Sequence, residues 1–271
     1  MGLVRTMLLL VGTVLVAYLA LCAWLYATQR SQIYFPTPAV QHPGARALWI
    51  ASEGQRIKVW AVSRPGPKAL VYFGGNADDA AWHIDPFSAA FPEHSLYLVN
   101  YRGYGGSTGQ PTETGLVADA RAVFDFVRAR QPDVTVIGRS LGSGIAVQLA
   151  AERPVARLVL VAGYDSLVNV ARAHFRWLPV GLLLRDRYES AHRAQAVTAP
   201  VLVIIAESDE VIPRARSAAL VAAFRPGQVQ VSVISGAMHN TLDLSPDFLR
   251  SVVAFVNGPE PEAPARDRGA S

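Results

Sequence analysis

A serine between two glycines stands where a short apolar segment meets a run of small residues. Residues 138–142 read Gly138-Arg139-Ser140-Leu141-Gly142, a G-x-S-x-G pattern. A nucleophilic serine sits on a sharp strand-to-helix turn that lifts its hydroxyl clear of the sheet, and such a crowded turn favours flanking glycines. The helix that follows directs its positive end at the site. We expect Ser140 to be a nucleophile on a turn shaped by Gly138 and Gly142; an ordinary glycine-rich turn is the alternative.

A serine hydroxyl needs a base within hydrogen-bond reach. Of the six histidines, His239 is the best placed, because it follows the last predicted strand in the loop 236–240 and so lies at the same end of the sheet as Ser140. The remaining histidines, expected to be structural, are His42, His83, His94, His174 and His192.

The histidine in turn needs a carboxylate that fixes its tautomer. Asp209 follows the strand 201–206 and is our choice, with Asp165 as the alternative. We expect the neighbouring Glu207 and Glu210 to be solvated. The chain order of serine, aspartate and histidine is the order expected when the serine stands on such a strand-to-helix turn.

The tetrahedral intermediate needs two backbone N–H donors. We expect one from Leu141, directly after the serine, and one from Asn76 in the segment Gly74-Gly75-Asn76-Ala77 that follows the third predicted strand. The glycines there let the backbone approach a substrate closely. An ordinary turn is the other interpretation of this segment.

Predicted strands and helices alternate from residue 45 onward, which favours an α/β fold with a mostly parallel sheet covered on both faces. The predicted strands are 45–50, 57–62, 69–73, 95–100, 134–138, 157–162, 201–206 and 229–234. The predicted helices are 112–129, 142–151, 214–224 and 246–256. The first two strands form a candidate antiparallel pair. Residues 165–199 break the alternation and predict a helical cap, in which Trp177 begins an apolar run that either lines an acyl pocket, touches a bilayer or packs on the domain.

The N-terminal segment carries no charge from Met7 to Ala27, between Arg5 and Arg30. As a helix this segment spans about 31 Å, close to the thickness of a bilayer's hydrocarbon core. It is longer than the apolar part of a signal peptide. We therefore predict a single-pass signal anchor over 1–29, with a cleaved signal peptide as the alternative and the catalytic domain on the non-cytoplasmic side of the membrane.

Two details of this region bear on the anchor. Cys22 follows a segment that resembles a lipoprotein cleavage box, but the large Leu21 before it argues against lipidation, so Cys22 is expected to be a small apolar residue of the span. Residues 30–44 form a predicted connector. In it, Tyr34 and Phe35 are placed either at the membrane interface or against the domain.

Composition limits the function classes. The net charge is only +4, and no basic stripe with interleaved aromatic residues is present, so we expect no nucleic-acid partner. A single cysteine allows no intramolecular disulfide and no cysteine metal site. We expect neither a metal nor a cofactor.

The sequence pattern divides the chain into the anchor, the connector, a domain over 45–257 and a disordered tail over 258–271. It does not predict an oligomeric state.

The combined motifs resemble the α/β-hydrolase superfamily, and within it the membrane-tethered, serine-aminopeptidase-like (Bem-type) group. The motifs are the segments 74–77, 100–107, 138–142, 208–213 and 239–240. Many members have histidine where Gly74 stands and glycine where Ala206 stands, and the first departure removes one source of side-chain support for the oxyanion loop.

The resemblance implies a serine hydrolase that cleaves a small or lipid-like acyl ester or thioester through an acyl-enzyme. Gly75, Tyr104 and Trp177 are then expected to contact the substrate. A peptidase or an acyltransferase would use the same triad. A catalytically silent, membrane-bound binding module of the same fold is the alternative from another class.

Overall fold

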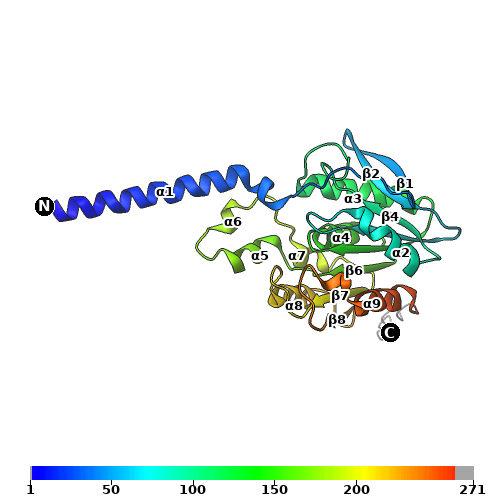
Figure 1. The fold of residues 1–271 in the computed structure, drawn as a ribbon. Helices are drawn as coiled ribbons and strands as arrows, with labels where there is room; N and C mark the ends of the chain where they lie inside the picture. Colours follow the sequence, from blue (N-terminus) through cyan, green and yellow to red (C-terminus); the bar gives the residue numbers. More distant parts are fainter. Residues whose placement is uncertain (1, 260–271) are drawn as a thin grey trace, which may run out of the picture.

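The computed structural model describes residues 2–259, and Figure 1 shows a long helix projecting from an α/β domain. Helix α1 (Gly2–Ile33) is long and apolar enough to cross a membrane, with a mean hydropathy of 2.4 over its most apolar window. It ends at Ile33 rather than at residue 29, so the predicted connector begins inside the helix. From residue 260 onward, the predicted tail lies outside the described residues.

The domain is built on one eight-stranded sheet of order β1-β2-β4-β3-β5-β6-β7-β8. The strands are β1 (Arg46–Ser52), β2 (Gln55–Val62), β3 (Lys68–Phe73), β4 (Ser95–Val99), β5 (Asp133–Arg139), β6 (Arg157–Val161), β7 (Val201–Ala206) and β8 (Val229–Ile234). Strand β2 runs antiparallel to both β1 and β4, and the remaining pairs are parallel. The predicted α/β fold with a mostly parallel sheet is confirmed, as is the antiparallel first pair.

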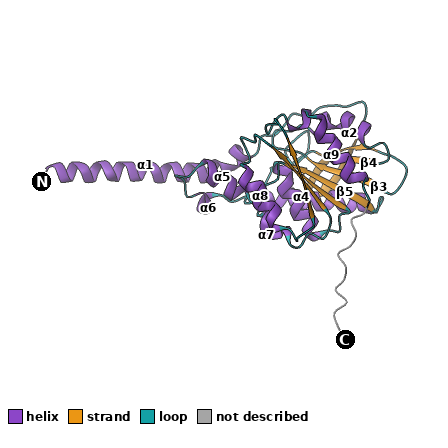
Figure 2. Ribbon diagram, turned by 90° about the horizontal axis from the view of Figure 1, so that it is seen from below, coloured by secondary structure: helices purple, strands orange, loops and turns teal. Residues whose placement is uncertain are grey.

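Helices cover both faces of the sheet, as Figure 2 shows. They are α2 (Ile84–Ala90), α3 (Glu113–Arg128), α4 (Leu141–Glu152), α8 (Arg214–Ala223) and α9 (Pro246–Asn257). Side chains of α3, α4 and α8 pack into one apolar core, and those of α2 and α9 pack into a second core on the opposite face. Strand β5 contributes Val136 to the first core and Ile137 to the second, as the alternation of side chains along a strand requires.

The segment 80–90, a short 3₁₀ turn (Ala80–His83) followed by α2, was not among the predicted helices. The segment contains Pro86, and a proline usually ends or kinks a helix. In the structure Pro86 lies in the first turn of α2, where its missing N–H costs nothing. Asp79 begins the segment by accepting a hydrogen bond from Ala81 N–H.

Three short helices form the cap between β6 and β7: α5 (Leu167–His174), α6 (Val180–Leu183) and α7 (Ser190–Ala194). In both views α5 and α6 lie beside the end of α1 (Figures 1 and 2). Buried Gln29 donates to Leu183 O at 3.0 Å and accepts from Arg185 N–H at 2.7 Å. The last turns of α1 are thus hydrogen-bonded to the cap backbone.

Arg30 and Tyr34 add further contacts between the end of α1 and the cap. Arg30 donates two hydrogen bonds to buried Asp186, at 3.0 and 3.2 Å. The Tyr34 hydroxyl lies 3.1 Å from the same carboxylate and 2.9 Å from the Tyr188 hydroxyl. Of the two placements open for the connector aromatics, Tyr34 packs on the domain, whereas Phe35 is exposed.

Candidate active site

Four loops meet at the carboxyl edge of the parallel strands, where α/β proteins place their ligands. Asn76 follows β3, Ser140 follows β5, Asp209 follows β7 and His239 follows β8. Strand β5 lies at the centre of the sheet and leads directly into α4, so Ser140 stands between the other loops.

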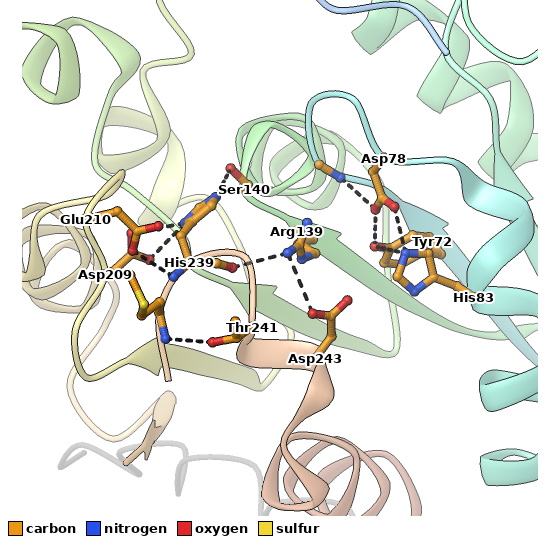
Figure 3. A network of polar contacts seen from close by, with 12 residues as sticks. Tyr72, Asp78, His83, Arg139, Ser140, Asp209, Glu210, His239, Thr241 and Asp243 are labelled. Atoms are coloured by element: carbon orange, nitrogen blue, oxygen red, sulfur yellow. Dashed lines mark hydrogen bonds and ion pairs between the residues drawn. The ribbon is translucent and has the colours of Figure 1, made fainter. Parts of the chain in front are cut away.

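Ser140, His239 and Asp209 form one hydrogen-bonded line, drawn in Figure 3. Ser140 Oγ lies 3.0 Å from His239 Nε2, and His239 Nδ1 lies 3.0 and 2.9 Å from the two carboxylate oxygens of Asp209. Since a carboxylate only accepts, Nδ1 carries the hydrogen and Nε2 is left to accept the serine proton. The histidine and aspartate side chains are buried, which shields this line from water.

The carboxylate of Asp209 is itself held in place. Its Oδ1 accepts the backbone N–H groups of Val211 and Ile212, at 2.9 and 2.7 Å. The alternative acid, Asp165, instead accepts from Asn169 and Arg216. The structure brings Asp209, and not Asp165, to the histidine.

The turn at Ser140 explains the two glycines around it. Ser140 has φ 48° and ψ −114°, a conformation that is costly for a residue with a side chain. A Cβ on Gly142 would overlap the carbonyl of Phe73, and one on Gly138 would overlap the carbonyl of Gly142. Close packing of β3, β5 and α4 therefore requires glycine at both positions.

Two backbone N–H groups are available beside the serine. Leu141 is the first residue of α4, and the first N–H groups of a helix have no partner within the helix. The backbone N–H of Asn76 has no acceptor among residues 2–259, and Asn76 lines the cavity at Ser140. The side chain of Asn76 accepts from Phe35 N–H and from the Tyr104 hydroxyl, each at 2.9 Å, which pins the loop.

Asp78 also supports this loop and was not among the residues predicted from the sequence (Figure 3). One carboxylate oxygen accepts Gly75 N–H at 3.1 Å and the Tyr72 hydroxyl at 2.7 Å, and the other lies 2.8 Å from His83 Nε2. Burial raises the pKa of Asp78, but the hydrogen bonds and charge of His83, the Tyr72 hydroxyl and the charge of Arg139 outweigh it and lower the pKa to about 2.

This contact corrects what the departure at Gly74 implied. The loop has side-chain support after all, from Asp78 instead of from a histidine at position 74. A Cβ on Gly74 would lie 2.8 Å from the Asp78 carboxylate, so the glycine and the aspartate fit together. The available signal was an acidic residue directly after the predicted oxyanion segment.

A second supporting residue, Arg139, lies next to Ser140. Its guanidinium donates to His239 O at 3.2 Å and lies 3.9 Å from the Asp243 carboxylate. Glu210 accepts His239 N–H at 3.1 Å, and Glu207 accepts Gly236 N–H at 2.8 Å. Both glutamates are exposed, as expected for solvated groups, yet each also holds the histidine loop.

A cavity of about 440 Å³ opens at Ser140 and is mostly apolar. Its lining includes Ile33 of α1 and Val170, Phe175 and Leu184 of the cap. His174, expected to be structural, lines it too and lies 2.9 Å from Val211 O.

The three residues predicted to contact the substrate are placed differently. Tyr104 is buried behind Asn76 and positions that residue. Trp177 lies outside the cavity wall and is 59% exposed, with its carbonyl 2.9 Å from the Tyr18 hydroxyl of α1. Gly75 is not among the residues that line the cavity, but it lies close to the serine, because a Cβ built on it would be 2.9 Å from the Arg139 guanidinium and 3.7 Å from Ser140 Cβ.

Comparison with known proteins agrees with this architecture. Residues 68–198 match the family model described as alpha/beta hydrolase fold. Over 241 residues the chain is 37% identical to the uncharacterized protein Rv2307c of Mycobacterium tuberculosis, covering 82% of this chain and 84% of that one. It is 27% identical to the lysophosphatidylserine lipase ABHD12 of Gallus gallus, covering 83% and 68%.

Among solved structures, the Pyrococcus furiosus esterase Pf2001 superposes with a TM-score of 0.68 at 17% identity, covering 82% of this chain and 98% of that one. At that identity the likeness concerns the fold. The family match, the sequence relatives and the sheet order agree, and the chain belongs to the α/β-hydrolase superfamily.

Proposed function

We propose that this protein is a membrane-anchored serine hydrolase that cleaves an acyl ester or thioester. The observation that carries the proposal is the line from Ser140 Oγ through His239 to Asp209, with both hydrogen-bond steps at about 3 Å. The apolar cavity beside the serine favours an apolar acyl group. The hydrolytic role is supported by relatives named as a lipase and an esterase.

The proposed reaction follows from the placement of these groups. Ser140 Oγ attacks the carbonyl carbon while His239 Nε2 takes the serine proton. The N–H groups of Leu141 and Asn76 stabilise the oxyanion, and Asp209 stabilises the histidine cation. Collapse expels the alcohol or thiol, which takes the proton from His239. Water then attacks the acyl-enzyme by the same route and releases the carboxylic acid.

Labelling with a fluorophosphonate probe tests the proposal. The full chain in detergent should label, Ser140→Ala should not, and Ser208→Ala should label like the wild type, because Ser208 is an exposed serine of a neighbouring loop. A folded wild type that takes up no probe would leave the silent binding module as the better account. Product analysis with an added alcohol acceptor separates a hydrolase from an acyltransferase.

The anchor is part of the proposal. Helix α1 is exposed along most of its length and is apolar enough to span a bilayer. Cleavage after the apolar run would remove Gln29 and Arg30 or separate them from the helix, and both hold the cap. We therefore expect α1 to be retained. The placement of the domain on the non-cytoplasmic side stays a prediction from the charge before the helix and from the position of the anchor ahead of a large domain. Release of the protein from membranes by alkaline carbonate would contradict the anchor. Resistance of the domain to a protease added from the non-cytoplasmic side of the membrane would contradict the orientation.

A further inference from the structure

A second cavity lies between the last turns of α1 and the cap. It has a volume of about 230 Å³. Its walls include Leu25 and Ile33 from α1 and Leu178 and Leu183 from the cap. Along the helix axis, the distance from Leu25 to Ile33 is about 12 Å. The cavity is therefore an apolar seam that runs along the end of α1.

This seam meets the cavity at Ser140. Ile33, Phe175 and Leu184 line both cavities. The two cavities therefore adjoin, and these apolar side chains lie at the boundary between the seam and the cavity of the candidate nucleophile. No charged side chain lines the seam among the described residues, so an acyl chain that follows it meets apolar surface and the amides of two glutamines.

The α1 wall of the seam is fixed. Gln29 is hydrogen-bonded on both sides to the cap backbone, and the Arg30–Asp186 pair with Tyr34 holds the next turn. A helix that served only as a tether would need none of these buried contacts. Their effect is to hold one face of α1 against α5 and α6 as part of the site.

The outer side of the cap is apolar where it follows α1. Trp177 and Leu182 are 59% and 85% exposed. The Tyr18 hydroxyl donates to Trp177 O, and Tyr18 lies within the uncharged run of α1, about 22 Å from Ile33 along the axis. If α1 spans a bilayer, this part of the cap and the seam's outer end lie at the level of the lipid.

A third cavity, of about 680 Å³, lies next to the oxyanion loop. Its lining combines charged side chains, among them Asp78, Arg139 and Asp243, with apolar ones, among them Trp82, Phe87 and Phe248. Asn76 lines both this cavity and the apolar one. One cavity at this loop is thus mostly apolar and the other carries charged groups beside apolar ones, which suits a substrate with an apolar tail and a polar head.

We propose that α1 forms a wall of the acyl-binding channel and that a single-chain acyl amphiphile passes from the bilayer along the α1–cap seam to Ser140. This inference rests on the proposed hydrolase function and on the proposed span. It makes the N-terminal helix a determinant of acyl-chain specificity, and the charged groups of the third cavity, Asp78, Arg139 and Asp243, receive the head group.

The test uses the full chain in non-ionic detergent, with nitrophenyl esters of graded acyl length. Leu25→Trp fills the seam, and Leu19→Trp is the matched control, since Leu19 is an exposed leucine of the same helix outside the seam. For an acyl chain of about sixteen carbons, we expect Leu25→Trp to lower kcat/KM by about tenfold, as loss of contact with two or so methylenes would. Esters of about four carbons should be cleaved equally well by all three proteins.

The outcomes separate the two proposals. A wild type that neither labels nor cleaves any ester would overturn the hydrolase function itself. A wild type that is active, with Leu25→Trp and Leu19→Trp having the same dependence on acyl length, would overturn the role of α1. If Leu25→Trp takes up no fluorophosphonate, Leu25→Ala replaces it. This smaller side chain should reduce only the long-chain activity, and an unchanged profile would again refute the inference.

Discussion

Substitution of Asp78, which accepts a hydrogen bond from the loop 74–77, tests in most detail how the candidate site is held. Asp78→Asn keeps the size of the side chain and an oxygen that can accept Gly75 N–H and the Tyr72 hydroxyl. It removes the negative charge opposite His83 and near Arg139. The variant therefore isolates the charge of a buried group while the local packing is preserved.

The pKa of this carboxyl sets the magnitude. It falls from an ordinary value of 3.8 to about 2 in the folded chain. One pKa unit corresponds to about 1.4 kcal/mol, so the ionised carboxylate contributes about 2 kcal/mol to the free energy of unfolding. Because the folded pKa is the lower one, this contribution is complete above about pH 4 and is lost as the pH falls toward 2.

Urea unfolding of both proteins, followed by tryptophan fluorescence in the same detergent, measures the effect. At pH 7 we expect Asp78→Asn to be less stable by about 2 kcal/mol, with the difference shrinking below pH 4. Equal stabilities at pH 7, or a difference that grows as the pH falls from 4, would refute the account of Asp78 as a charged support.

Three further predictions follow from the geometry. Gly142→Ala should abolish fluorophosphonate labelling and lower the melting temperature, because the new methyl overlaps a β3 carbonyl; normal labelling would contradict the packing argument. Arg30→Gln should lower the free energy of unfolding in urea by about 1–2 kcal/mol, because Asp186 then stays buried without its cation; the value is modest because Arg30 is partly exposed to solvent. An unchanged urea midpoint would show that the Arg30–Asp186 pair contributes little to stability. Asp209→Asn should lower kcat by about 10⁴, with Asp165→Asn affecting it far less; the reverse order would reassign the acid.

The sharp turn at Ser140 could be predicted from local sequence. Gly138 and Gly142 flank Ser140 because a strand, a sharp turn and a helix within a few residues leave no room for a Cβ, and that constraint is visible in five letters. The strands were predictable for a similar reason, since buried parallel strands are continuous apolar runs. His239 and Asp209 followed from their positions after such strands.

The supports of the site depend on residues that are distant in the sequence or whose role has no pattern. Asp78 was missed because one acidic residue in a loop has many possible partners, and only the fold brings Tyr72 and His83 to it. Tyr104 is predicted to contact the substrate, but the fold turns its hydroxyl toward Asn76 instead. The direction of a tyrosine hydroxyl in a glycine-rich loop cannot be read from the sequence.

The N-terminal helix shows most clearly which features follow from the local sequence and which depend on the tertiary structure. By itself the sequence determined that residues 7–27 are uncharged and long enough to cross a bilayer, because hydropathy and helical rise are local properties. Only the tertiary structure decided that the helix continues to Ile33 and contributes to the wall of the cavity at Ser140. The physical reason is that Gln29 and Arg30 find their partners more than 150 residues away, in the cap, and no local pattern encodes a contact at that separation.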